Sequence, residues 1–139
     1  DMYEINISES LIPISSGENV TIYEYEFIRF LDGWPTSDRM YISITSKGDL
    51  RTLHVENVGL FEGKQNIFID STILNKSIET KLNSIYSKNY SYSYEIINQT
   101  LTFTPEEQLA IISQIELELI KNGDKHNTGV VLTTIINNQ

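Results

Sequence analysis

Residues 22–45 read IYEYEFIRFLDGWPTSDRMYISIT, and this stretch decides the fold class. Aromatic residues alternate with glutamate from Tyr23 to Phe27, which predicts a half-buried β-strand. A run rich in turn-forming residues follows at 32–38, and alternation resumes at 39–45. The stretch therefore predicts two antiparallel strands joined by a short turn.

A third strand is expected at residues 50–58, after a short turn at 46–49 in which Gly48 supplies a positive φ. Three consecutive strands with short connections predict a β-meander over residues 22–58. Residues 1–20 are mixed and polar, so we expect an irregular N-terminal segment there, with an edge strand at most at its apolar residues 11–14.

One convincing helix is expected at residues 71–88, because Asp70 offers N-cap chemistry and no glycine or proline interrupts the segment. Its apolar residues recur at spacings of four, four and three and form a single stripe. They are Leu74, Ile78, Leu82 and Ile85. This stripe must be buried, and the apolar face of the sheet is the available partner.

A second meander is expected at residues 90–137, where period-two alternation returns. Residues 109–120 could also form a helix, since Leu and Glu are good helix formers, but the sustained alternation favours a strand. The elements together predict an α+β fold in the order β-β-β-α-β-β-β. Antiparallel meanders pack on one central helix in this fold, within a single domain of residues 1–139.

Composition limits the function classes. The chain has 139 residues, no cysteine and a net charge of -9, which excludes thiol chemistry and argues against a nucleic-acid surface. The two histidines, His54 and His126, lie 72 positions apart in different elements, and no nucleophile or phosphate-binding motif is present. We therefore expect no catalytic residue, no metal site and no cofactor.

The loop around Trp34 is the first candidate binding site. Asp32 and Asp38 flank it and could approach each other as a calcium clip or a glycosidase-like acid pair. A simple role in the turn is the favoured interpretation of both aspartates. Trp34 itself is expected at the loop tip, where it could contact a partner.

A row of tyrosines is the second candidate site. Tyr90, Tyr92 and Tyr94 share one face of a predicted strand and could bind carbohydrate or an extended peptide. Packing against a helix is the favoured role of such a row. The alternative function is a small-molecule or carbohydrate-binding domain with a cavity between helix and sheet. An enzyme with distant catalytic residues is the least favoured class.

The stretch 25–50 resembles PepSY-like, peptidase-propeptide-type domains of exported Gram-positive proteins. The similarity lies in an aromatic strand, an Arg–x–x–Asp–Gly–x–Pro turn at 29–35, an alternating strand and a Gly–x–Leu hairpin at 48–50. It extends as a hydrophobic and turn pattern over residues 22–137, and it implies that the expected α+β fold is PepSY-like or cystatin-like. The family repeat opens with a helix before its first strand, and residues 1–20 depart from that pattern.

This resemblance implies non-catalytic work outside the cytoplasm. Domains of this type inhibit or assist the folding of a peptidase, or regulate envelope sensor kinases. The implied partner is a peptidase or an envelope protein, contacted through an exposed sheet edge or loop. The implied location is extracellular or the cell envelope, with the signal segment absent from this fragment and any membrane attachment through a removed anchor.

Overall fold

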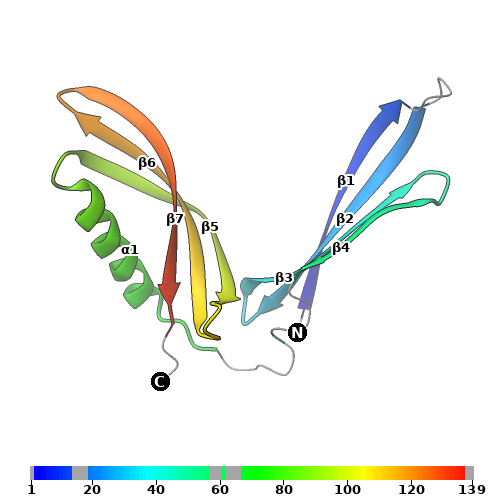
Figure 1. Ribbon diagram of the computed structural model, residues 1–139, viewed down its shortest axis with the longest axis horizontal. Helices are drawn as coiled ribbons and strands as arrows, with labels where there is room; N and C mark the ends of the chain where they lie inside the picture. The colour runs from blue at the N-terminus through cyan, green and yellow to red at the C-terminus, as the bar shows by residue number, and fades with distance from the viewer. Residues whose placement is uncertain (1, 14–18, 57–60, 62–66, 137–139) are drawn as a thin grey trace. The chain divides into compact units, whose positions relative to one another are not determined.

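Two units of antiparallel β-structure make up the chain in this computed structural model, residues 1–65 and residues 66–139. Among the residues that the structure describes, the first unit contains four strands, and the second contains three strands and one helix (Figure 1). The structure describes residues 2–13, 19–56, 61 and 67–136.

The first unit is a meander in which each strand pairs with the next. Its strands are β1 (Met2–Pro13), β2 (Asn19–Leu31), β3 (Trp34–Thr45) and β4 (Leu50–Glu56). Asp32 and Gly33 alone connect β2 to β3, with φ values of 48° and 81°. Two consecutive positive φ angles are what a tight two-residue hairpin turn requires, and the Asp-Gly pair tolerates them.

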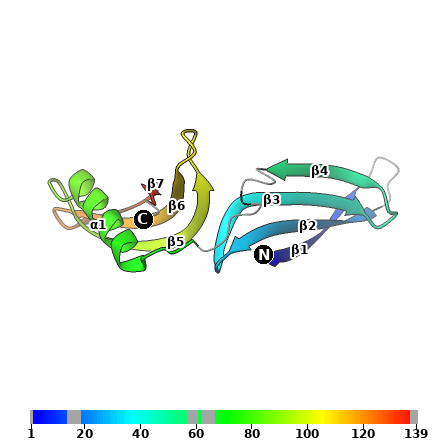
Figure 2. The ribbon, with the colours of Figure 1, turned by 90° about the horizontal axis from the view of Figure 1, so that it is seen from below.

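The second unit is a three-stranded meander with a helix along one face (Figure 2). Helix α1 spans Ser71–Tyr86, and the strands are β5 (Ser91–Phe103), β6 (Leu109–Lys121) and β7 (Asp124–Ile135). Alternate residues of the central strand β6 are buried on the helix side. The core of this unit contains Leu74, Ile78, Leu82, Leu101, Ile111, Ile115 and Leu117.

The predicted start of the helix is confirmed, and so is the burial of most residues of its predicted apolar stripe. The Asp70 carboxylate accepts hydrogen bonds from the backbone N–H groups of Thr72 and Ile73, at 2.9 Å and 3.3 Å. These bonds satisfy two of the amides that a helix start leaves without partners. Ile85 is the exception in the stripe, since it is 53% exposed near the end of the helix. Ile85 therefore lies outside the contact of α1 with the sheet, although the half-buried Tyr86 still lies beside Tyr92, with ring centroids 6.2 Å apart.

The predicted fold class is wrong. The protein is mostly β-structure, four strands precede the helix, and α1 covers the three-stranded sheet of the second unit. A central helix between two meanders is therefore not the architecture. The error arose because the apolar stripe of α1 showed that a sheet must cover it, but not which sheet.

The N-terminal segment also differs from the expectation, since β1 occupies residues 2–13 where an irregular stretch was predicted. Residues 109–120 form a strand, β6, as favoured. Strand β7 begins at Asp124, directly after the Asn122–Gly123 turn. Residues 14, 57, 58 and 137, at the ends of predicted strands, lie outside the described residues.

Within the described ranges, α1 is the one helix, and it lacks the length and apolar character needed to cross a bilayer.

Candidate functional site

The sheet of the first unit has two chemically different faces, because side chains alternate sides along each strand. One face, called the polar face below, carries two rows of polar residues across the four strands. These rows are Asn6–Glu26–Tyr41–His54 and Ser8–Glu24–Ser43–Thr52. The opposite face, called the apolar face, carries the rows Ile5–Phe27–Met40–Val55 and Ile7–Tyr25–Ile42–Leu53.

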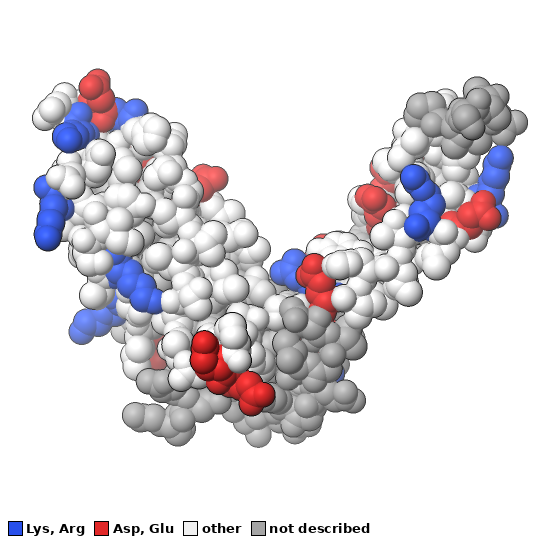
Figure 3. Space-filling model, in the orientation of Figure 1, with Lys and Arg blue, Asp and Glu red and all other residues white. Residues whose placement is uncertain are grey.

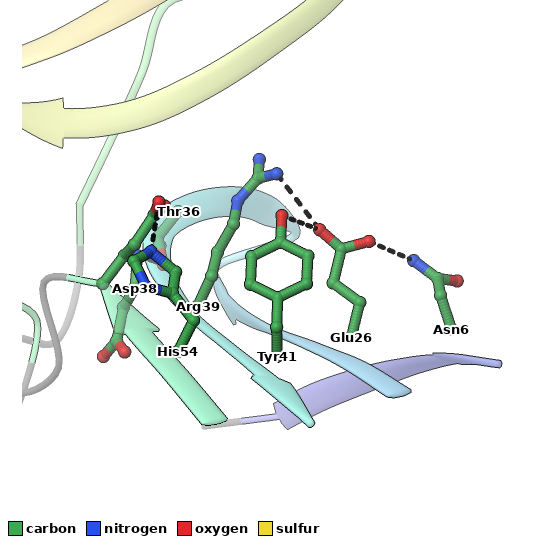
Figure 4. Close-up of polar contacts among 8 residues, drawn as sticks. Asn6, Glu26, Thr36, Asp38, Arg39, Tyr41 and His54 are labelled. Carbon is green, nitrogen blue, oxygen red and sulfur yellow. Dashed lines mark hydrogen bonds and ion pairs between the residues drawn. The ribbon is translucent and has the colours of Figure 1, made fainter. Parts of the chain in front are cut away.

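Glu26 is the centre of the contacts on the polar face (Figure 4). The Tyr41 hydroxyl donates a hydrogen bond of 2.7 Å to Glu26 Oε1. Arg39 Nη1 lies 3.4 Å from the same oxygen, and Asn6 Nδ2 donates to the other carboxylate oxygen at 3.5 Å. Donors from β1 and β3 thus hold this carboxylate of β2 in one orientation.

The hydrogen bond to Glu26 raises the pKa of Tyr41 above its ordinary value, because the bond to the carboxylate stabilises the protonated phenol. Partial burial of the ring raises the pKa further. The ring of His54 lies beside that of Tyr41, with centroids 6.2 Å apart, and His54 Nε2 is 2.9 Å from Glu56 Oε1. The polar face therefore presents two ring faces among ordered hydrogen-bonding groups.

A groove of about 660 Å³ runs along this face, lined by both polar rows and Glu56, and also by Ile7, Tyr25 and Ile42. Its side chains offer carboxylates, hydroxyls, an amide and two rings, which is the chemistry for holding a polar ligand. Among the described residues, no group of histidine and acidic side chains has the arrangement that would hold a metal ion.

The apolar face is exposed at its margins. Ile5 is 52% exposed, Ile7 66%, Leu53 58% and Val55 48%, and all four lie on the outer strands β1 and β4. The side chains between them on β2 and β3 are half-buried. None of the eight residues in the two apolar rows is charged. Contiguous exposed apolar surface of this kind marks interaction sites in soluble proteins.

A buried network lies toward the β2–β3 turn. Arg29 Nη1 is 3.2 Å from Asp38 Oδ2, and both side chains are almost fully enclosed. The Thr36 hydroxyl donates to the Arg29 carbonyl oxygen at 2.9 Å and accepts from the Asp38 amide at 3.2 Å. These contacts join the two strands beside the bulge between Ile28 and Phe30.

The tyrosine row of the second unit lies under the helix. Tyr92 donates a hydrogen bond of 2.7 Å to Asn83 Oδ1, and Tyr94 donates one of 3.4 Å to Glu79 Oε1. Burial raises the pKa of Tyr94, and the neighbouring Glu79 raises it further. The three rings are half-buried, and the Lys121 ammonium group lies 5.6 Å from the centroid of the Tyr90 ring. A groove of about 530 Å³ between α1 and β5 is lined by Tyr90, Tyr92, Tyr94, Glu79 and Asn83 among others.

The candidates near the β2–β3 turn are not brought together as one site. Asp32 is exposed in the two-residue turn, whereas Asp38 is 1% exposed in the ion pair with Arg29. Trp34 is the first residue of β3, pairs with Leu31 and is half-buried rather than at a loop tip. The turn is shorter than the sequence suggested, so residues 34–38 belong to the strand.

Sequence analysis missed the polar cluster at Glu26, Tyr41 and His54, and it missed the exposed margin of the apolar face on β1. The sequence did contain a signal for the apolar margin on β1, since isoleucine alternates with polar residues at positions 4–8.

On the side drawn in Figure 3, basic and acidic side chains are interspersed, with no continuous basic patch among the residues described there.

Three comparisons with known proteins add no relative. No protein-family model, no curated protein and no solved structure matches this chain.

Proposed function

We propose that this chain is a non-catalytic interaction domain that binds a protein partner through the apolar face of the first sheet. The observation that carries the proposal is the set of four apolar side chains on β1 and β4 that are about half exposed or more. Moving such side chains out of water contributes on the order of 1 kcal/mol each, which a partner with an apolar surface would gain.

The partner class follows from the resemblance to propeptide-type domains. We propose a peptidase or a cell-envelope protein as the partner, and an extracellular or envelope location. The apolar rows form an uncharged contact surface. The partner surface that fits them is therefore apolar and extends over a similar area. The acidic surroundings of the face favour basic residues at the rim of the partner.

A crosslinking experiment with a matched control tests this function. A photoreactive amino acid placed at Leu53 lies on the apolar face, and the same group at Thr52 lies one residue away on the polar face. We expect crosslinks to the partner from position 53 and not from position 52. The partner identified by crosslinking is then purified, and its affinity for this chain is measured directly. We expect Leu53→Asp to weaken this affinity by more than about tenfold.

Stability measurements separate docking from folding. Leu53→Asp should leave thermal unfolding nearly unchanged if the face is a docking surface, because the side chain is 58% exposed. A fall in stability typical of a core substitution would show instead that this face belongs to the interior of the protein, and it would refute the proposal. Equal crosslinking from positions 52 and 53 would do the same.

A second candidate function is the binding of a carbohydrate or another small polar molecule. The groove between α1 and β5 favours it, because three tyrosines line the groove. A glycan panel followed by NMR tests this function. Shifts at Tyr90, Tyr92 and Tyr94 and a higher melting temperature would support it, and an unchanged spectrum across the panel would count against it.

A further inference from the structure

Strand β1 forms the edge of the first sheet. It is 12 residues long, and among the described strands β2 is its only partner. The β1–β2 register runs without interruption from Met2 to Pro13. A long regular edge of this kind presents a row of backbone donors and acceptors that can pair with another chain.

The direction of the backbone groups on β1 follows from one hydrogen bond at the other side of β2. The Ser46 amide donates to the Thr21 carbonyl oxygen at 2.8 Å, so the backbone of Thr21 is directed toward β3. Backbone N–H and C=O groups alternate between the two sides of an antiparallel strand. The backbone groups of Glu24 and Glu26 are therefore directed toward β1. Their partners on β1 are Ser8 and Asn6, whose backbone N–H and C=O groups are therefore directed toward β2.

The odd-numbered residues of β1 consequently direct their N–H and C=O groups to the outer edge. Between residues 4 and 12, where the structure describes the side chains, they are Ile5, Ile7, Glu9 and Leu11. Their side chains are all exposed, and the apolar ones at positions 5 and 7 lie in the rows of the apolar face. An added strand would extend both the hydrogen-bonded ladder and the apolar face.

The edge strand β7 of the second unit is protected, in contrast to β1. Helix α1 lies against β7, and the Lys81 ammonium group donates a hydrogen bond to the Thr133 carbonyl oxygen. Strand β1 has no lysine and no proline before its last residue, Pro13. Two of the common protections of an edge, a covering element and an interior lysine or proline, are thus absent from the described surroundings of β1, whose charged residues are Glu4 and Glu9.

The charges around β1 define the partner. Residues 1–65 contain 11 acidic and 5 basic residues, a net charge of -6. Glu4 on β1 and Glu24 and Glu26 on the adjacent strand lie on the polar face, whereas Glu9 lies on the apolar face beyond Ile7. A strand beside β1 is therefore favoured when it carries lysine or arginine on the polar face and apolar residues on the other.

We propose that the outer edge of β1 binds an extended segment of a partner protein by strand addition, and that this segment alternates apolar residues with lysine or arginine. This inference deepens the proposed function and rests on it, since it specifies a partner segment for the same sheet. Main-chain hydrogen bonds would supply affinity, and the alternation would select the register.

The probe is a synthetic peptide of about eight residues that alternates valine with lysine, enough to span most of an ordinary strand. A peptide of the same composition without the alternation, and one with glutamate in place of lysine, are the controls. We expect binding of the alternating peptide to slow amide exchange at Ile5, Ile7 and Glu9. We expect both control peptides to bind at least about tenfold more weakly.

Two substitutions at one position separate the backbone from the side chain. Ile7→Pro removes an outward N–H and no hydrogen bond to β2, a placement that edge strands tolerate. Ile7→Thr keeps the N–H and the branched shape. We expect Ile7→Pro to weaken peptide binding by about tenfold or more and Ile7→Thr by less than about threefold. Unchanged Trp34 emission in both variants shows that the first unit stays folded.

Three outcomes would overturn the inference: equal binding of the peptide without alternation, full binding by Ile7→Pro, or a dimer in sedimentation that Ile7→Pro dissociates. The last outcome would assign the edge to a second copy of this chain. Leu53→Asp distinguishes the two proposals, because it alters the apolar face on β4 and leaves the edge of β1 intact. Peptide binding that survives in this variant while partner binding is lost would support both.

Discussion

Arg29 and Asp38 form a buried ion pair across the β2–β3 ladder, with Nη1 and Oδ2 3.2 Å apart. Arg29 is 8% exposed and Asp38 is 1% exposed. The pair lies beside the bulge between Ile28 and Phe30, and the Thr36 hydroxyl bridges the same two strands. It ties together the part of the first sheet where the regular register is interrupted.

Breaking this pair should destabilise the first unit strongly. Asp38→Ala leaves the Arg29 guanidinium buried without its carboxylate, and such a loss costs about 3 kcal/mol of unfolding free energy. Urea unfolding followed by tryptophan fluorescence measures it, because Trp34 is the one tryptophan of the chain. Asp32→Asn is the matched control, an exposed residue of the adjacent turn. A cost below about 0.5 kcal/mol for Asp38→Ala would show that the pair adds little.

The hydrogen bond from Tyr41 to Glu26 makes the stability of the first unit depend on alkaline pH. Since the folded state raises the pKa of Tyr41 above 10.0, the folded state holds this proton more tightly than the unfolded state. The contribution is complete below pH 10.0 and is lost as the pH rises through the raised pKa of Tyr41. Unfolding monitored at Trp34 should show a fall in this range that is smaller in Tyr41→Phe. An identical pH profile for the variant would contradict the assignment.

Ile85 should contribute little to the contact between the helix and the sheet, although it lies on the predicted stripe. Ile78 is fully buried, so Ile78→Ala should reduce the unfolding free energy of the second unit by about 3 kcal/mol. Ile85 is 53% exposed, so Ile85→Ala should change it by less than about 0.5 kcal/mol. Thermal unfolding followed by the far-ultraviolet helix signal compares the two variants. Similar losses at both positions would mean that Ile85 belongs to the contact with the sheet.

A buried hydroxyl in β7 offers a stabilising substitution. Thr134 Oγ1 is enclosed and has no hydrogen-bond partner, and Thr134 lies opposite Ile111 on the helix side of the sheet. Thr134→Val keeps the shape and removes the polar atom, which should raise the unfolding free energy by about 1 kcal/mol. Differential scanning calorimetry measures the change, with the exposed neighbour Thr133→Val as the control. A lower melting temperature for Thr134→Val would show that the hydroxyl has a role in the fold.

Much of the local structure could be predicted from the sequence. The start of α1 at Asp70, the strand β6 and the turns at Gly33 and Gly48 follow from capping, alternation and turn chemistry. The architecture did not follow, because alternation shows that a strand has two different faces without showing what covers either face. Strand β1 was missed for a related reason. An edge strand with one polar face needs few apolar residues, and Asn6 and Ser8 made the segment look irregular.

The candidate site was harder to predict than the fold. Glu26, Tyr41 and His54 are far apart in the sequence, and only the registers of three adjacent strand pairs bring them into one row with Asn6. Packing was correctly favoured for the tyrosine row, and hydrogen bonds from Tyr92 and Tyr94 to α1 show how it is achieved. The position of Trp34 depended on the length of a turn, which alternation alone does not fix.

Within each unit, every strand pairs with the one before or after it in the chain. Each hairpin can therefore close as soon as its second strand has emerged from the ribosome, without waiting for distant sequence. The entropy cost of closing such short loops is small, and local topologies of this kind fold quickly. The four strands of the first sheet can accordingly pair during translation, without waiting for the strands of the second unit to emerge from the ribosome.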